Sequence, residues 1–223
     1  MPGYYAERLS AERLRECYEI APPRVQQYLE AEVQHVAGRI RPGDAVLELG
    51  CGYGRVLERL APKCRTLVGI DTSRSSLELA RKLLSRFPNC KLAQMDAVAL
   101  GFRDRVFDVV LCTQNGVSAF GVDQRALIAE SIRVTRAGGR VLFSSYAESF
   151  WDDRLEWFRL QAERGLVGEI DWAATGDGVI VCKDGFRAAT LGPEEFLALT
   201  SGFDVERRIE EVDQSSVFCE IVV

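Results

Sequence analysis

Three glycines and one acid stand where they could bind a nucleotide-like ligand. Gly50, Gly52 and Gly54 follow an apolar run at 45–49, and Asp71 ends a second short apolar run, about 20 residues after the first glycine. Glycine permits positive φ and leaves no Cβ in a ligand's way, while the free amides at a helix start favour polar or anionic groups. A carboxylate at this spacing lies beside a ribose diol in a nucleotide-type βαβ unit. On its own the glycine-rich turn is weak evidence, and the acid strengthens it.

The elements that must position these residues alternate between strands and helices. A first strand ends at the glycine turn, and a short helix after the turn breaks at Pro62. Such alternation predicts an α/β fold whose parallel sheet carries helices on both faces. The remaining expected strands are 67–71, 90–94, 106–112, 139–145, 204–212 and 216–223, and the helices are about 75–86, about 123–135 and one that opens at 193.

Two segments stand outside this alternation. Residues 1–40 predict an N-terminal helical cap, with helical spacing at 7–20 and 25–36 on either side of Pro22 and Pro23. Residues 146–190 predict a small α+β insertion that would act as a lid or substrate segment. It comprises an aromatic-rich helix and short strands at 169–174, 179–183 and 186–190. With 223 residues the chain fits a single domain, 1–223.

Composition narrows the class of protein. Hydrophobic residues at 47% and charged residues at 27% match an average soluble globule. The net charge of −5 disfavours a nucleic-acid partner, since affinity for phosphate backbones comes largely from Lys and Arg. No apolar run approaches membrane-spanning length and the start lacks a secretory pattern, so we expect a cytoplasmic protein without a membrane partner. The seven cysteines form no Cys-x-x-Cys pair, and we expect no metal site.

Four motifs together resemble the class I S-adenosylmethionine-dependent methyltransferases, from about Gly43 to Val223. They are Val46-Leu47-Glu48-Leu49-Gly50-Cys51-Gly52-Tyr53-Gly54, Gly69-Ile70-Asp71, Gln94-Met95-Asp96-Ala97, and Phe107-Asp108-Val109-Val110 followed by Arg136-Ala137-Gly138-Gly139-Arg140-Val141-Leu142. The main rival is a nicotinamide dinucleotide fold, which prefers Gly-x-Gly-x-x-Gly. Here the third glycine comes one residue too early and Glu48 precedes the turn, which suits a cofactor without phosphates.

The resemblance implies a fold and a set of cofactor contacts. The implied fold is Rossmann-like, with a seven-stranded sheet of order 3-2-1-4-5-7-6 and strand 7 antiparallel. The implied cofactor is S-adenosyl-L-methionine, which leaves as S-adenosyl-L-homocysteine. The acid at 71 would bind both ribose hydroxyls, and the acid at 96 with its neighbour would meet the adenine amino edge. The implied cofactor-binding residues are Glu48, Gly50, Cys51, Gly52, Gly54, Asp71, Thr72, Asp96, Ala97 and Thr113.

Each of these roles has a structural alternative. Asp71 and Asp96 could instead cap the turn or helix that follows them. The glycines could form only a tight strand-to-helix turn. Glu48 could be a structural acid satisfied by loop amides.

The methyl acceptor and any catalytic group are less defined. The loop after the fourth strand supplies Gln114 and Asn115, which with Tyr146 are the catalytic candidates, although Asn-Gly is also ordinary turn chemistry. His35 has no recognisable carboxylate partner and makes a poor base. Transfer would then rest on alignment and exclusion of water, worth ~7–11 kcal/mol in well-oriented systems. Candidates for the substrate wall, each of which could equally be core packing, are Tyr4, Tyr5, Tyr146, Trp151 and Trp172.

The sequence favours an enzyme that methylates a small molecule by in-line displacement, acting as a monomer or homodimer. An alternative is a non-catalytic protein of the same fold that binds the cofactor or supports a partner, since cofactor motifs report binding alone. A second alternative is aminopropyl transfer, which usually needs an acid pair after strand four. The segment Thr113-Gln114-Asn115-Gly116 offers none.

Overall fold

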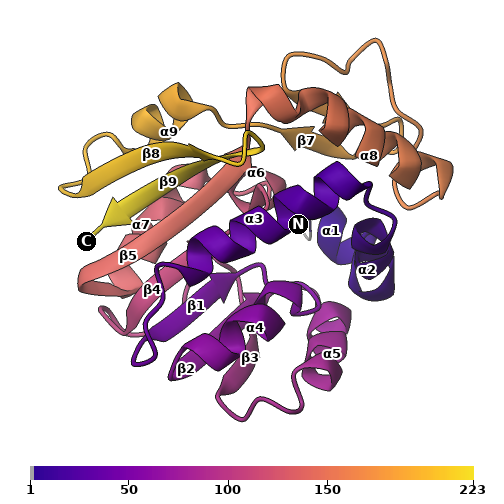
Figure 1. Cartoon of the computed structure of the whole chain (residues 1–223). Helices are drawn as coiled ribbons and strands as arrows, with labels where there is room; N and C mark the ends of the chain where they lie inside the picture. The colour runs from indigo at the N-terminus through magenta and orange to yellow at the C-terminus, as the bar shows by residue number, and fades with distance from the viewer. Residues whose placement is uncertain (1–2) are drawn as a thin grey trace.

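A seven-stranded mixed sheet forms the centre of the computed structural model, which describes residues 3–223 (Figure 1). Residues 1 and 2 of the expected cap lie outside the described residues. The strand order β3-β2-β1-β4-β5-β9-β8 confirms the predicted sheet, and β9 is the strand antiparallel to β5. The strands are β1 (Ala45–Leu49), β2 (Thr66–Asp71), β3 (Cys90–Gln94), β4 (Phe107–Cys112), β5 (Thr135–Tyr146), β8 (Glu206–Val212) and β9 (Ser216–Val222).

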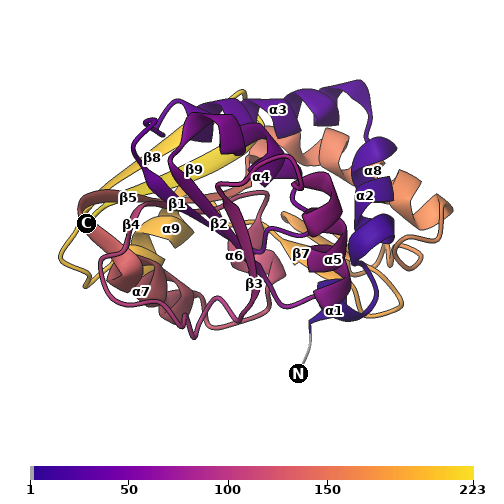
Figure 2. The ribbon, with the colours of Figure 1, turned by 90° about the horizontal axis from the view of Figure 1, so that it is seen from below.

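Helices cover both faces of this sheet, as predicted. The central strands β1 and β4 are buried along their whole length, because successive side chains enter cores on opposite faces. Val46 packs in the core with α3, α4 and α5, whereas Leu47 packs with α7 and α9. Figure 2 shows α3 on one side of the sheet and α7 on the other. The helices are α3 (Pro23–Ala37), α4 (Arg55–Leu60), η1 (Ala61–Lys63), α5 (Arg74–Leu83), α6 (Gly116–Ala119), α7 (Gln124–Val134) and α9 (Pro193–Thr200).

The N-terminal cap and the insertion after β5 share a third core. Tyr28 of α3, Phe150 and Trp157 are buried together there. The cap and the insertion are far apart in the sequence, which is why spacing alone could not predict that they meet. The cap adds α1 (Tyr4–Glu7) and α2 (Ala11–Glu19), and the insertion contains η2 (Glu148–Phe150), α8 (Trp151–Glu163), β6 (Val179–Val181) and β7 (Arg187–Ala189).

Two local predictions were wrong, and one short helix was not expected. The expected helix at 7–20 is interrupted, because α1 ends at Glu7 and α2 begins at Ala11 after an extended Ser10. The expected strand at 169–174 is a turn with one isolated bridge at Ile170, since the Asp171 carboxylate accepts from the amide of Ala173. The short helix α6 was not predicted.

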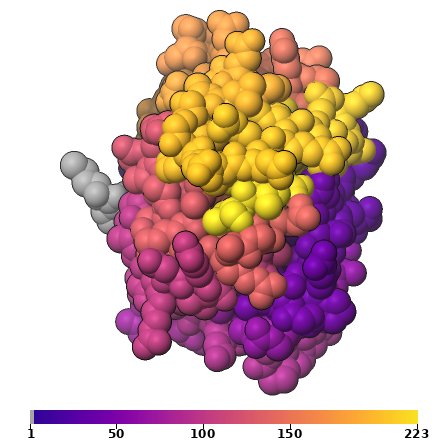
Figure 3. Space-filling model, turned by 90° about the vertical axis from the view of Figure 1, so that its left-hand side faces the viewer, coloured from indigo at the N-terminus to yellow at the C-terminus, as the bar shows by residue number. Residues whose placement is uncertain are grey.

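The last two strands close one side of the sheet. In Figure 3 the yellow C-terminal segment covers much of one side of the molecule, below the orange insertion. Within residues 3–223, none of the helices combines the length and the apolar character needed to cross a membrane.

Candidate functional site

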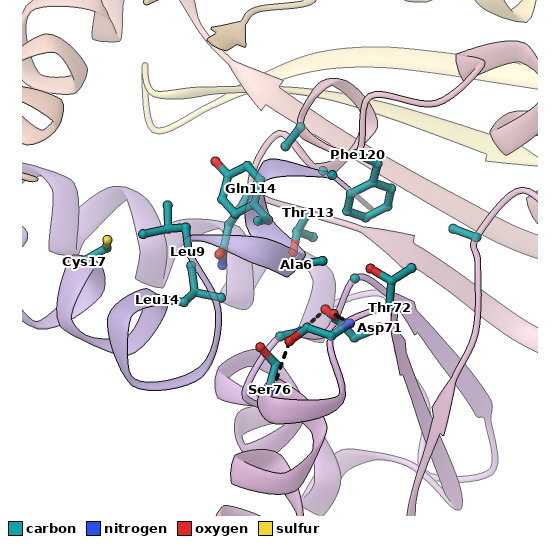
Figure 4. Close-up of a pocket in the computed structure, with 18 of the residues that line it drawn as sticks. Ala6, Leu9, Leu14, Cys17, Asp71, Thr72, Ser76, Thr113, Gln114 and Phe120 are labelled. Atoms are coloured by element: carbon teal, nitrogen blue, oxygen red, sulfur yellow. Dashed lines mark hydrogen bonds between the residues drawn. The ribbon is translucent and has the colours of Figure 1, made fainter. Parts of the chain in front are cut away.

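A pocket of about 220 Å³ lies where β1, β2, β3 and β4 end, beneath the N-terminal cap (Figure 4). Open α/β sheets bind ligands at this edge. The sheet side of the pocket is lined by Gly50, Gly52, Asp71, Thr72, Ser73, Ser76, Met95, Asp96, Ala97, Thr113, Gly116, Ala119, Phe120 and Val122. The cap side is lined by Gly3, Tyr5, Ala6, Leu9, Leu14, Cys17, Tyr18, Gln114, Tyr146, Trp157, Phe158 and Gln161.

The glycine turn after β1 contributes bare backbone to this pocket. Gly50 has φ +68° and Gly52 has φ +53°, conformations that L side chains rarely adopt. A Cβ on Gly50 would lie 2.3 Å from Cζ of Phe120, and one on Gly52 would lie 3.0 Å from Leu14. Any larger residue at these positions would therefore fill the cradle that a ligand needs.

Two neighbours of these glycines lie outside the pocket lining. Gly54 is the N-cap residue of α4 and has φ +90°, and a Cβ there would lie 3.1 Å from Leu84 and 3.3 Å from Ala80. Its role is thus the close packing of α4 against α5. Cys51 is buried against the backbone of Gly69, where a Cβ would lie 2.9 Å from the cysteine sulfur.

Asp71 ends β2 and does two things at once. Its Oδ2 accepts from the amide of Gly52 at 2.8 Å, and its Oδ1 accepts from the amide of Ser73 at 2.7 Å. Burial raises the pKa of this carboxyl, and the amides of Ser73 and Gly52 oppose that shift. Each carboxylate oxygen has more than one acceptor site. The carboxylate can therefore brace the turn and still accept from a ligand diol.

The acid after β3 occupies the next position along the same edge. Asp96 lines the pocket beside Met95 and Ala97, and its Oδ1 accepts from the amide of Val98 at 3.1 Å. This local bond is the capping contact that the sequence allowed. The second carboxylate oxygen makes no hydrogen bond to the described residues and remains an acceptor for an amino edge.

Glu48 is buried behind the glycine turn and does not line the pocket. Its Oε2 has no hydrogen-bond partner among residues 3–223. Burial raises the pKa of its carboxyl to about 8, although nearby Arg55 opposes the shift. The loop amides expected to satisfy it do not reach this oxygen.

The loop after β4 holds two consecutive residues in the left-handed region. Gln114 has φ +54° and Asn115 has φ +61°, a conformation that a non-glycine residue keeps only when its surroundings fix it. The backbone N–H of Gln114 donates to Oε2 of Glu32 at 3.0 Å and to Oγ of Ser144 at 2.9 Å. The strain is thus held by a carboxylate of α3 and a hydroxyl of β5.

Glu32 was missed by the sequence reasoning. It is 0% exposed, and its Oε1 accepts from the hydroxyl of Ser216 at 3.0 Å. Burial raises the pKa of this carboxyl to about 7, against the hydrogen bonds that it accepts. The sequence feature that could have identified Glu32 is its place on the apolar face of α3, between Leu29 and Val33.

Asn115 points away from the pocket. Its Nδ2 donates to the carbonyl of Ala189 at 2.9 Å, and its Oδ1 accepts from the hydroxyl of Ser145 at 2.8 Å. The side chain is buried and joins α6 to β5 and the insertion. The structure does not bring this catalytic candidate into the lining, whereas Thr113 and Gln114 are both there.

The aromatic candidates divide between pocket and scaffold. Tyr5 and Tyr146 line the cap side, where burial raises the pKa of both phenols, that of Tyr146 to about 12. Tyr4 instead donates to the carboxylate of Asp184. The other two are also outside the lining: Trp151 is partly buried beside Arg154, and Trp172 is 60% exposed.

Three further wall residues come from segments that sequence spacing could not bring together. Tyr18, Trp157 and Gln161 line the cap side. The Trp157 indole donates to the carbonyl of Cys17 at 2.7 Å, which joins α8 to α2. The cap and the insertion thus form one wall.

Among residues 3–223, the carboxylates that line the pocket are those of Asp71 and Asp96 on the sheet side, and the cap side offers phenols instead. The buried phenols stay protonated near neutral pH because their pKa values are raised. His35 stacks on Phe218 outside the lining, and burial lowers the pKa of its imidazole to about 4. Within the described part of the chain, no group of three His, Cys, Asp or Glu residues is arranged to hold a metal ion.

The residues that line the pocket fit an adenosine cofactor. Bare glycine backbone and an acid at the end of β2 stand beside a second acid at the end of β3. A diol has acceptors at Asp71, and an amino group has one at Asp96. A positively charged ligand would meet two carboxylates on the sheet side and tyrosine rings on the cap side.

Comparisons with known proteins agree with this geometry. A model for a methyltransferase domain matches residues 46–139. The chain is 28% identical to the 2-methyl-6-phytyl-1,4-hydroquinone methyltransferase of Synechocystis, over 60% of this chain and 43% of that protein. It is 31% identical to a probable tRNA methyltransferase 9B of Bos taurus, over 56% of this chain and 24% of that protein. The chain spans less than half the length of these curated relatives.

A solved structure extends the comparison to the whole fold. The DhpI–SAM–HEP complex matches with a TM-score of 0.64 and 20% identity, over 98% of this chain and 94% of that one. At this identity the match establishes the shared fold.

Proposed function

We propose that this chain, which belongs to the class I S-adenosylmethionine-dependent methyltransferases, transfers a methyl group from that cofactor to a small-molecule nucleophile. The observation that carries the proposal is a single pocket with two different sides. Its sheet side holds the glycine turn and two acids, and its cap side is aromatic and apolar. A cofactor and an acceptor can thus meet in one pocket.

The residues of the sheet side would hold the cofactor. Asp71 would accept from the ribose hydroxyls, Asp96 would accept from the adenine amino group, and Gly50 and Gly52 would allow the amino-acid end to lie on the backbone. Thr72, Ala97 and Thr113 also line this side. Glu48, Cys51 and Gly54 would support the turn from behind. When bound, the cofactor supplies an electrophilic methyl group on a sulfonium.

The cap and the insertion would act as the lid over the acceptor. Residues of α1, α2 and α8 close the pocket opposite the sheet. Their apolar and aromatic side chains would exclude water and align the acceptor for in-line displacement, an effect worth ~7–11 kcal/mol in well-oriented systems. Because Asp71 and Asp96 would be engaged by the cofactor and the phenols of Tyr5 and Tyr146 stay protonated, we expect an acceptor atom that reacts without removal of a proton from a neutral alcohol.

A small acceptor is favoured over a polymer by the modest size of the pocket, about 220 Å³, and by the net charge of −5. The hydroquinone methyltransferase relative is named for a small-molecule acceptor. The tRNA methyltransferase relative defines the competing outcome, which the test below includes.

The test has two stages. Thermal unfolding with S-adenosylmethionine, S-adenosylhomocysteine or NADH identifies the cofactor, because a ligand that binds the folded state raises its melting temperature. Stabilisation by NADH alone would reject the proposal. Incubation with radiolabelled S-adenosylmethionine and separate metabolite, RNA and protein fractions then locates the methyl group. Label in RNA or protein but never in metabolites would contradict a small acceptor, and binding without any transfer would favour a non-catalytic protein.

A further inference from the structure

Two hydrogen-bond donors on the cap side of the pocket have no acceptor. Nε2 of Gln161 and Nε2 of Gln114 are both buried without a partner among residues 3–223. Gln161 is 2% exposed, and both side chains line the pocket. A buried donor left unpaired costs about 1–3 kcal/mol. Two such donors facing one cavity indicate a ligand that brings acceptor atoms.

The orientation of Gln114 is set by a neighbour. Its Oε1 accepts from the hydroxyl of Tyr18 at 2.8 Å, which leaves its amide nitrogen as the free end. Figure 4 shows Gln114 above Leu9 and Leu14 at the pocket. The side chain therefore offers a donor to the ligand, while its own acceptor is already used.

A buried cation lies directly behind the same wall. Arg154 is 1% exposed, and its guanidinium lies 4.3 Å from the ring centroid of Tyr146, which lines the pocket. Two of its nitrogens donate to the carbonyls of Gly178 and Ala188, and its Nε has no acceptor in the described chain. Within residues 3–223 no carboxylate comes within 4.0 Å of this guanidinium. A buried charge without a counter-ion is costly unless something compensates it.

Gln161 follows Arg154 by two helical turns on α8, so the two side chains lie on the same face of that helix. A second guanidinium, that of Arg55, lies 4.8 Å from the ring of Tyr18. The cap side is thus backed by two cations, each stacked on a tyrosine of the wall.

The acids nearby do not cancel this charge. Asp71 and Asp96 line the opposite, sheet side of the pocket. Glu32 and Glu48 act on Arg55, but burial raises the pKa of Glu32 to about 7 and that of Glu48 to about 8. Neither acid forms an ion pair with Arg154, whose guanidinium donates to the carbonyls of Gly178 and Ala188 instead. The uncompensated positive charge is therefore that of Arg154.

We propose that the methyl acceptor is a small carboxylic acid with an apolar body, whose carboxylate binds to Gln161 and Gln114 on the cap side, with Arg154 behind the wall. This inference rests on the proposed function, because it names the class of acceptor for the same pocket. The carboxylate supplies the acceptor atoms that the two amides lack and the negative charge that the guanidinium lacks. The rings and aliphatic chains of the cap side receive the apolar body.

The test uses the full chain loaded with S-adenosylhomocysteine. Calorimetric titration compares 3-phenylpropanoate and octanoate with their uncharged primary amides. We expect the acids to bind at least tenfold more tightly than the matched amides, a difference of ~1.4 kcal/mol or more. Gln161→Leu should weaken binding of the acids about tenfold and leave the amides little changed. Gln161→Glu should abolish binding of the acids, because it places a negative charge beside them.

The matched control is Gln34→Leu, the same exchange at an exposed glutamine of α3 that bonds only to Glu30. It should leave all four ligands unaffected, and S-adenosylhomocysteine binding reports that each variant is folded. Equal binding of acids and amides, no binding of either acid, or retention of acid binding in Gln161→Glu would overturn the inference while the proposed function stands. Failure of the unaltered protein to bind S-adenosylhomocysteine would instead refute the proposed function, and the inference with it.

Discussion

The carboxyl of Glu32 should make the protein less stable as the pH rises, and Glu32→Gln should remove that dependence. Glu32 is fully buried, and no Lys, Arg or His lies within ion-pair distance of it in residues 3–223. Its pKa is raised from a usual value of 4.5 to about 7. The folded state therefore holds a proton that the unfolded state has already released, so stability is greatest below the unfolded pKa and falls as the pH rises through the folded pKa.

The size of the effect follows from these two pKa values. At 1.36 kcal/mol for each pKa unit, ionisation of Glu32 lowers the free energy of unfolding by roughly 2–3 kcal/mol between about pH 5 and pH 8. A glutamine at this position keeps an acceptor for the backbone N–H of Gln114. The hydroxyl of Ser216 can rotate to accept from the side-chain nitrogen of the new glutamine. The substitution thus removes the titration with little change in packing.

Urea unfolding of both proteins at the two pH values measures the difference directly. Contributions of other groups, including Glu48, are common to both proteins and largely cancel. Glu30→Gln on the same helix is the control, because Arg59 holds the pKa of that carboxyl below 4.5 and its titration lies below the tested range. Parallel loss of stability in the unaltered protein and in Glu32→Gln would refute the assignment.

Four further substitutions test the site. Asp71→Ala should weaken binding of S-adenosylmethionine by roughly 1–3 kcal/mol in calorimetry, since a charged acceptor is lost, and unchanged affinity would remove its role. Gly50→Ala should lower cofactor affinity, because its Cβ would lie 2.3 Å from a Phe120 ring atom at positive φ; cofactor titration checks this, and normal affinity would show that no ligand uses the turn. Asn115→Ala should cost about 1–3 kcal/mol in urea unfolding, because it leaves buried partners of two hydrogen bonds unpaired, and a stable variant with altered methyl transfer would return Asn115 to a direct role. Trp172→Ala should change stability by less than about 0.5 kcal/mol and leave transfer rates unchanged, because the side chain is 60% exposed outside the pocket; a large loss of transfer would restore it as a substrate contact.

Local sequence was sufficient to predict which residues line the sheet side of the pocket. Gly50, Gly52 and Asp71 lie at strand ends that short apolar runs identify, and parallel strands bring their carboxyl ends to one edge. The strand order followed from the resemblance in motif order. Gly54 and Cys51 belong to the same motif but face away from the pocket, because consecutive residues of a tight turn point in different directions.

The cap side could not be predicted to the same extent. Gln161 and Tyr18 are brought together by packing between the cap and the insertion, which no local pattern encodes. Glu32 braces the loop at Gln114 across 82 residues of sequence. Asn115 has a residue type suited to a catalytic loop, yet its neighbours in space use both ends of its amide.

The most direct test of the account is a crystal structure of the full chain with S-adenosylhomocysteine. The account predicts that the two ribose hydroxyls donate to the Asp71 carboxylate, that the adenine amino group faces Asp96, and that the sulfur points toward the cap side of the pocket. A nucleoside bound elsewhere, or a pocket that stays filled by Phe120 and Leu14 at saturating ligand, would contradict it.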